Sequence, residues 1–198
     1  DTPGHIDFTV EVKRSLRVLD GAVVVFDGVA GVEPQSETNW RYADEANVPR
    51  VCFVNKLDRT GASFEHSYKT ILDRLTKKAI RMQIPIGLED NFEGVIDLLK
   101  MKAYYFEGDM GNNVIEKEIP ENLKADAEKY HAILVEKIVE HDEEMMMAFL
   151  DGKLDFDIEA LKKVARKAVI ANDIIPVFAG TALKNKGVQL VLDGVVDY

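Results

Sequence analysis

The sequence predicts an α/β fold in which helices cover a mainly parallel β-sheet. Three short apolar runs, at 22–28, 50–56 and 174–180, are rich in valine and isoleucine or phenylalanine and end in polar or glycine residues. This composition is typical of strands that are buried on both faces of a parallel sheet. Helical patterns lie between and around the runs, and such alternation favours a layered α/β sheet.

The helical patterns can be located along the chain. Before the first run, apolar side chains repeat at helical spacing at Phe8, Val12 and Leu16, and after the second run they do so across 64–75. The C-terminal segment 186–198 predicts a last helix that covers the sheet. In a sheet of this kind, ligands bind at the carboxyl ends of the strands.

The alternation breaks between about 83 and 172. In this stretch the sequence predicts short strands at 83–87 and 94–98, a hairpin within 103–119, a long helix opened by Pro120, and another helix at about 157–171. We interpret 83–172 as an α+β subdomain that is inserted before the last strand of the sheet. The main domain then consists of 1–82 and 173–198.

Composition excludes several classes of protein. With 25 Lys and Arg against 35 Asp and Glu, the formal net charge is −10, which disfavours bare nucleic acid as a partner for the surface as a whole. A single cysteine, Cys52, rules out a disulfide framework or a CxxC metal site. No run of about 18 apolar residues occurs, so we expect an intracellular protein without a membrane partner.

The loop after the second run carries the motif NKLD. Guanine presents two adjacent donors, its N1–H and its exocyclic amine, which one carboxylate can accept together, whereas adenine lacks this pair. We predict that Asp58 is this acceptor, that Asn55 ties the loop and reaches the base, and that the stem of Lys56 lies over the ring. A wrong base would leave polar groups unpaired, at a cost of about 1–3 kcal/mol per group.

The loop after the third run reads TALKNKG. Thr181, Ala182 and Leu183 are small or apolar enough for their backbone N–H groups to face O6 of a guanine base. By itself the pattern is equally typical of an ordinary turn between a strand and a helix.

The first five residues, DTPGH, suit the phosphate end of the same ligand. An Asp at a strand end can hold Mg²⁺, directly or through water, and a Gly lets a backbone N–H approach the terminal phosphate. We predict that Asp1 is the metal ligand, that Thr2, Pro3 and Gly4 form the nucleotide-binding turn, and that Pro3 stiffens it. His5 is the predicted catalytic residue, placed to orient the attacking water.

These three motifs, in this order, resemble the G domain of a translational GTPase. The stretches 1–43, 48–64, 83–103 and 180–198 closely resemble the elongation factor G family, with 83–172 as its inserted G-prime subdomain, so the resemblance covers essentially the whole chain. The elongation factor that delivers tRNA shares the motifs but lacks the insert. Ribosome-recycling and ribosome-protection GTPases share the motifs as well and remain alternatives.

The resemblance implies a P-loop-GTPase-type sheet and a ribosome-stimulated GTPase that drives translocation of tRNA and mRNA. GTP or GDP and Mg²⁺ would be its ligands, and the ribosome, through rRNA and the stalk proteins, its partner. A cytoplasmic location follows, although a mitochondrial or plastid one stays open. Thr181 stands where the family usually has Ser, and this exchange keeps the hydroxyl group.

The family's phosphate loop, GxxxxGK[ST], occurs nowhere in the 198 residues, nor does its first switch. We therefore expect the sheet to be incomplete at its N-terminal strands, and a polypeptide of these residues to bind nucleotides weakly and hydrolyse GTP negligibly. Loss of a central strand would leave AVVVFD at an exposed edge, through which copies could self-associate. The alternative from another class is a non-catalytic scaffold that presents the insert to a protein partner.

Overall fold

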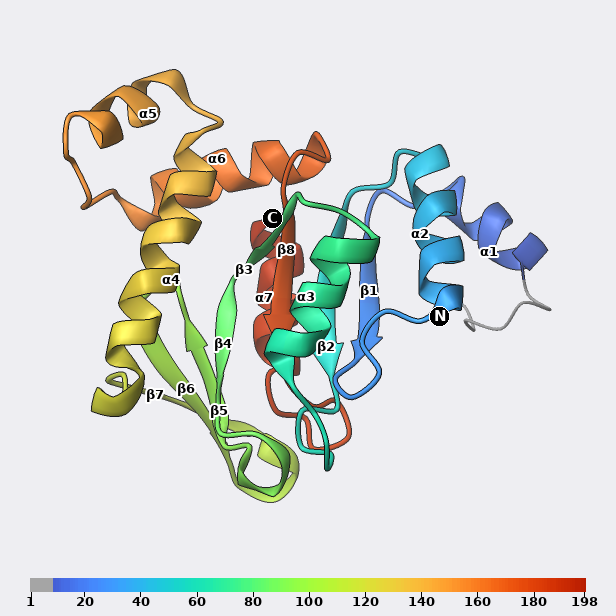
Figure 1. Ribbon diagram of the computed structural model, residues 1–198, viewed down its shortest axis with the longest axis horizontal. Helices are drawn as coiled ribbons and strands as arrows, with labels where there is room; N and C mark the ends of the chain where they lie inside the picture. The colour runs from blue at the N-terminus through green and yellow to red at the C-terminus, as the bar shows by residue number, and fades with distance from the viewer. Residues whose placement is uncertain (1–8) are drawn as a thin grey trace.

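The computed structural model describes residues 9–198, and its central layer is a parallel sheet (Figure 1). In spatial order the strands are β1 (Ala22–Asp27), β2 (Arg50–Asn55), β8 (Ile175–Ala179) and β3 (Ala79–Arg81). The three predicted strands are confirmed. β3 was not predicted, because three residues are too few to show a hydrophobic period.

The last strand of the chain lies inside the sheet. β8 pairs in parallel with β2 on one side and with β3 on the other. The chain therefore leaves the sheet after β3, forms the inserted elements, and returns to fill the position between two strands that precede the insert. The predicted α/β class with an inserted subdomain is confirmed.

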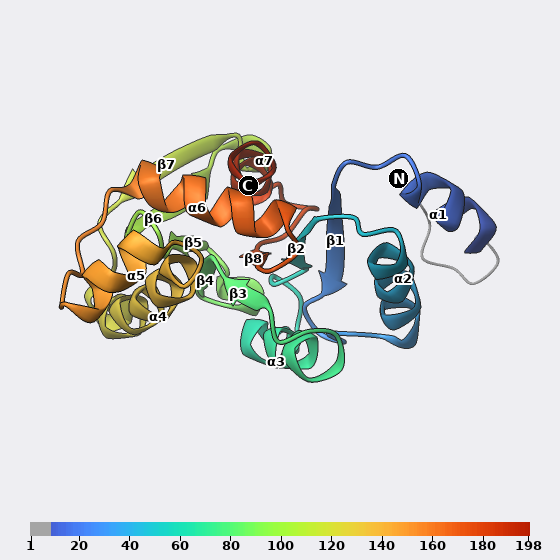
Figure 2. The ribbon, with the colours of Figure 1, turned by 90° about the horizontal axis from the view of Figure 1, so that it is seen from above.

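Helices lie on both faces of the parallel sheet (Figure 2). One face is covered by α2 (Pro34–Glu45) and α3 (Phe64–Arg74), and the other by α6 (Ile158–Ile170) and α7 (Val188–Asp197). Alternation along β2 explains this. Cys52 and Val54 pack with Ile71 of α3, whereas Val51 and Phe53 belong to the cluster on the opposite face. A strand that is buried on both sides needs the continuous apolar run seen in the sequence.

The first described helix, α1 (Thr9–Leu16), packs on α2. Val12 and Leu16 are buried there against Ala43 and Val48. This small cluster holds the start of the described chain beside the β1 side of the sheet.

A second, antiparallel sheet forms the first half of the insert. Its strands, in order, are β4 (Gln83–Ile86), β5 (Gly94–Asp97), β6 (Lys102–Glu107) and β7 (Asn113–Lys117). Short 3₁₀ turns join β4 to β5 at η2 (Glu89–Asn91) and β6 to β7 at η3 (Asp109–Gly111). The predicted strands and hairpin are therefore present.

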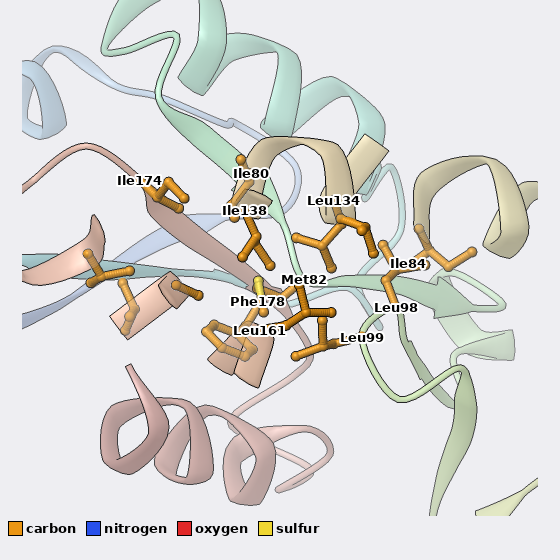
Figure 3. Close-up of a cluster of buried hydrophobic side chains, with 14 of the residues drawn as sticks. Ile80, Met82, Ile84, Leu98, Leu99, Leu134, Ile138, Leu161, Ile174 and Phe178 are labelled. Carbon is orange, nitrogen blue, oxygen red and sulfur yellow. The ribbon is translucent and has the colours of Figure 1, made fainter. Parts of the chain in front are cut away.

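The helices α4 (Glu121–Val139), α5 (Glu143–Leu150) and α6 complete the insert and join its core to that of the parallel sheet. Figure 3 shows Ile80 of β3, Ile138 of α4 and Phe178 of β8 in one cluster, and all three belong to the same group of buried residues. The backbone is continuous as well, because Met82 N donates to Val177 O and Leu98 N donates to Met82 O, each at 2.9 Å. The insert is thus packed against the parallel sheet, and its exact limits at 83 and 172 stay a prediction.

β1 lies at one edge of the described parallel sheet. Val23 and Val25 are 43% and 54% exposed, whereas Phe26 on the same strand is buried. An apolar, unpaired edge of this kind is a pairing hazard. Self-association through it stays a prediction.

Candidate nucleotide-binding site

The predicted base-recognition loops meet at one edge of the parallel sheet. Asp27 is the register partner of Asn55, and Val54 is the register partner of Ala179, so the ends of β1, β2 and β8 are level. Because the strands are parallel, the loops that follow them lie side by side (Figure 1). Residues 55–58 and 181–183, more than 120 positions apart in the sequence, are thereby brought together.

Asn55 ties these two loops. Its Oδ1 accepts hydrogen bonds from the backbone N–H of Lys56 and from that of Ala182, each at 2.8 Å. A backbone bond from Leu57 N to Gly180 O, at 3.2 Å, reinforces the link. The amide nitrogen of Asn55 makes no hydrogen bond within residues 9–198, so it is available to donate to an acceptor on a ligand. Asn55 therefore links the two loops in the structure, and its predicted contact with a base stays a prediction.

Asp58 holds a carboxylate that is mostly shielded from solvent. Its side chain is 13% exposed, and Oδ2 lies 3.1 Å from Nζ of Lys184. Partial burial raises the pKa of Asp58, but the Thr181 hydroxyl and the Lys184 ammonium lower it by more, so the pKa lies below its usual value. Asp58 is therefore ionised at neutral pH and acts as an acceptor only, as the pairing with two guanine donors requires.

Thr181, Ala182 and Leu183, in the loop after β8, differ in burial and in whether their N–H groups are already paired. Thr181 is buried, its backbone pairs with Lys186, and its hydroxyl lies beside Asp58 without a well-formed hydrogen bond of its own. The N–H of Ala182 already donates to Asn55, so a base oxygen would have to share or replace that bond. Leu183 is 81% exposed, and its N–H has no acceptor in the described part of the chain. Leu183 thus offers a free backbone donor, and its contact with O6 of a guanine base stays a prediction.

Lys56 is directed toward the end of β1. It adopts a left-handed backbone conformation, with φ of 63°, and its Nζ lies 2.8 Å from Oδ2 of Asp27. Asp27 also accepts hydrogen bonds from the N–H groups of Val29 and Ala30. Burial raises the pKa of Asp27, but the Lys56 ammonium and these two hydrogen bonds lower it by more, so the pKa lies below its usual value. Asp27 was not predicted as a site residue, although an Asp at the carboxyl end of a predicted parallel strand is a usable signal.

Asp1, Thr2, Pro3, Gly4 and His5, the predicted phosphate and metal end of the site, lie outside the described residues. Within 9–198 no group of three or more His, Cys, Asp or Glu side chains is arranged to hold a metal ion. The proposed Mg²⁺ ligand, Asp1, therefore stays a prediction.

Acid should weaken this edge of the sheet. Asp27 and Asp58 have pKa values below their usual 3.8, so protons bind the unfolded chain more readily than the folded one. The stabilisation is complete only well above the unfolded-state value, and we expect it to be lost as the pH falls through that value and then through the lower folded-state values, from about pH 5 to 2. Urea unfolding across this range should show a shallower acid decline for Asp27→Asn than for Asp90→Asn, whose carboxylate is exposed. Equal declines would contradict the assignment.

A family model described as the elongation factor Tu GTP binding domain matches residues 1–198. The chain belongs to this family of GTP-binding domains. A solved structure of a protein from Thermus thermophilus is also similar, with a TM-score of 0.89 and 27% sequence identity over 100% of this chain. The match covers 29% of the Thermus protein, so the chain spans less than a third of that protein's length.

The chain is therefore a GTPase domain of the translation-factor type, and the ligand that the family implies is a guanine nucleotide. The described side chains fit its base: a shielded carboxylate at Asp58 can accept the two guanine donors, and a free amide at Asn55 can donate to its acceptor edge. In the part of the chain that the structure describes, no helix is both long and apolar enough to cross a membrane.

Proposed function

We propose that the chain forms the base-recognition side of the G domain in a ribosome-dependent GTPase of the elongation factor G kind, which drives translocation of tRNA and mRNA. The observation that carries the proposal is the meeting of Asn55, Asp58 and the 181–183 loop at the carboxyl edge of a parallel sheet. The inserted subdomain supports the finer assignment, because the predicted resemblance to this factor includes an insert at the same place in the sheet.

Guanine is the base that this edge suits. The two donors N1–H and the exocyclic amine would bind the carboxylate of Asp58 and displace or share its contact with Lys184. The free amide of Asn55 would donate to the acceptor edge of the ring, and the free N–H of Leu183 to O6. Adenine offers a single amine and no N1–H, so it would leave the shielded carboxylate of Asp58 underpaired.

The phosphate end completes the proposal. We assign GTP and GDP to the site, with Mg²⁺ held by Asp1, the terminal phosphate approached by Gly4, and the attacking water oriented by His5. When bound, Mg²⁺ would neutralise charge on the phosphate oxygens. Ribosomal RNA and stalk proteins are the proposed partners, and the cytoplasm, where ribosomes work, is the proposed location.

The test is a titration of a polypeptide of these 198 residues. It carries no glycine-rich phosphate loop, so we expect weak binding of GDP, with a dissociation constant of about 1 mM, and no measurable binding of ADP at the same concentrations. Amide chemical shifts of residues 55–58 and 181–183 would follow the binding. Guanosine should act like GDP, because the base makes the described contacts. GTP turnover should stay at background, and turnover above it would contradict the predicted inactivity.

A second candidate is a scaffold that presents the insert to another protein. Exposed apolar side chains on and after α5 favour it: Met147, Leu150 and Leu154 are each at least 67% exposed. The same titration separates the candidates. A folded chain whose loop signals respond neither to GDP nor to guanosine would support the scaffold and overturn the nucleotide site.

A further inference from the structure

The two turns at the end of the antiparallel sheet lie against the two base-recognition loops. Figure 1 shows the turn between β4 and β5 and the turn between β6 and β7 at the same lower end of the molecule as the loops that follow β2 and β8. The described hydrogen bonds join each turn to one of these loops or to both.

Glu89, in the turn between β4 and β5, holds the loop that follows β2. Its backbone N–H donates to Leu57 O, and its carboxylate accepts from Gly61 N, each at 2.8 Å. These two bonds bracket Asp58 along the chain. Glu89 keeps a left-handed conformation, with φ of 57°, which a non-glycine residue adopts only at some cost in energy.

The same turn also reaches the loop that follows β8. Lys186 donates from Nζ to Phe92 O at 3.0 Å. Lys186 in turn pairs through its backbone with Thr181, closing the loop that presents Ala182 and Leu183. One turn of the insert therefore touches both recognition loops.

Gly111, in the turn between β6 and β7, packs against the backbone of the loop after β8. A Cβ at this position would lie 2.8 Å from Lys184 O and 3.1 Å from Asn185 O, so the two backbones are in contact with no room for a side chain. Gly111 O also accepts from Nε2 of Gln189 at 3.2 Å. The residue held here, Lys184, is the ion-pair partner of Asp58.

We propose that the inserted subdomain positions the base-recognition loops, with Glu89 and Gly111 as the positioning residues. This inference rests on the proposed function for its meaning, since the loops matter because they read a guanine base. Its physical content is independent of any ligand: residues 55–61 and 181–187 keep their mutual hydrogen bonds because two turns of the insert brace them.

Amide hydrogen exchange in the unliganded 198-residue chain tests the bracing directly. Leu57, Ala182 and Lys186 donate the bonds that close the loops, so their amides are the reporters. In Glu89→Ala and in Gly111→Ala we expect exchange at these amides to rise by about tenfold or more, while amides in the middle of β2 and β8 change by less than about threefold. Local opening of the loops, rather than global unfolding, gives this pattern.

Matched controls separate positioning from general damage. Gly152→Ala also replaces a glycine in the left-handed region, with φ of 93°, but a Cβ there meets nothing within 4 Å. Glu93→Gln alters an exposed carboxylate in the same turn as Glu89. Both should leave the reporter amides unchanged, and Glu89→Gln, which keeps an oxygen to accept from Gly61, should largely restore them. The Glu89 side chain is only partly buried, so Glu89→Ala should stay folded. It therefore still tests the positioning role if Gly111→Ala unfolds the whole chain.

Base discrimination gives the second readout. Inosine diphosphate lacks the exocyclic amine, so the ratio of GDP to inosine diphosphate affinity reports the alignment of Asp58. We expect Glu89→Ala and Gly111→Ala to lower this ratio at least about threefold, which a uniform loss of structure would not do. Reporter amides within about twofold of the controls in both variants would overturn the positioning role. Absence of GDP binding in the unmodified chain would overturn the proposed function instead, and exchange alone would then decide the positioning role.

Discussion

Replacing Leu57 by alanine is expected to lower the free energy of unfolding by about 2–5 kcal/mol, although the residue lies in a loop. Leu57 is fully buried between Asn55 and Asp58, and it packs in the cluster that contains Phe26 and Val54. Truncation removes buried methyl groups and leaves a cavity that the braced loop cannot collapse to fill. Urea unfolding monitored by circular dichroism measures the change.

Leu183→Ala is the matched control. It removes the same atoms from the other recognition loop, where the side chain is 81% exposed, so the expected change is less than about 0.5 kcal/mol. Equal changes in the free energy of unfolding for the two substitutions would show that burial of Leu57 does not stabilise the loop.

Replacing Asp58 by asparagine is expected to reduce GDP affinity by about tenfold or more, because guanine then faces one acceptor and one donor instead of a carboxylate. Leaving a buried donor or acceptor unpaired costs about 1–3 kcal/mol, which is roughly a 5- to 150-fold change in the dissociation constant. The exchange should also reverse the preference between bases. Xanthine carries an oxygen where guanine has its amine, and that oxygen can accept from the new amide.

Titrations with GDP and with xanthosine diphosphate, followed by loop amide shifts, check both parts of this prediction. Asp90→Asn, at an exposed position in η2, serves as the control and should keep the GDP preference. Loss of both diphosphates in Asp58→Asn, with the loops still protected from exchange, would contradict direct contact between the base and this side chain.

The sequence was sufficient for the parts of the site that lie next to a strand. The apolar run before Asn55 predicts a buried strand. In a parallel sheet, the loops that follow this strand and the last strand lie at the same edge, which brings Asp58 and Thr181 together. The motif NKLD could be placed in this way because strand burial and loop chemistry are both local signals.

Long-range contacts could not be predicted from the residues alone. Lys184, within the TALKNKG loop, reaches Asp58, and Glu89 reaches Gly61 from the insert. No local sequence pattern specifies either of these pairings. The prediction for Ala182 was incomplete for the same reason: its N–H is held by Asn55, 127 residues away in the sequence. β3 was not predicted because its three residues are too few to show a hydrophobic period.

The single cysteine of the chain lies in the middle of β2, where no part of its side chain reaches solvent. Burial raises the pKa of Cys52 to about 12, so hardly any reactive thiolate exists at neutral pH while the sheet is closed. A sulfhydryl reagent can therefore modify the protein only during openings that separate β2 from its helices. In a purified polypeptide of these 198 residues, the rate of that modification therefore measures how often the sheet opens, because Cys52 is the single thiol in the sequence.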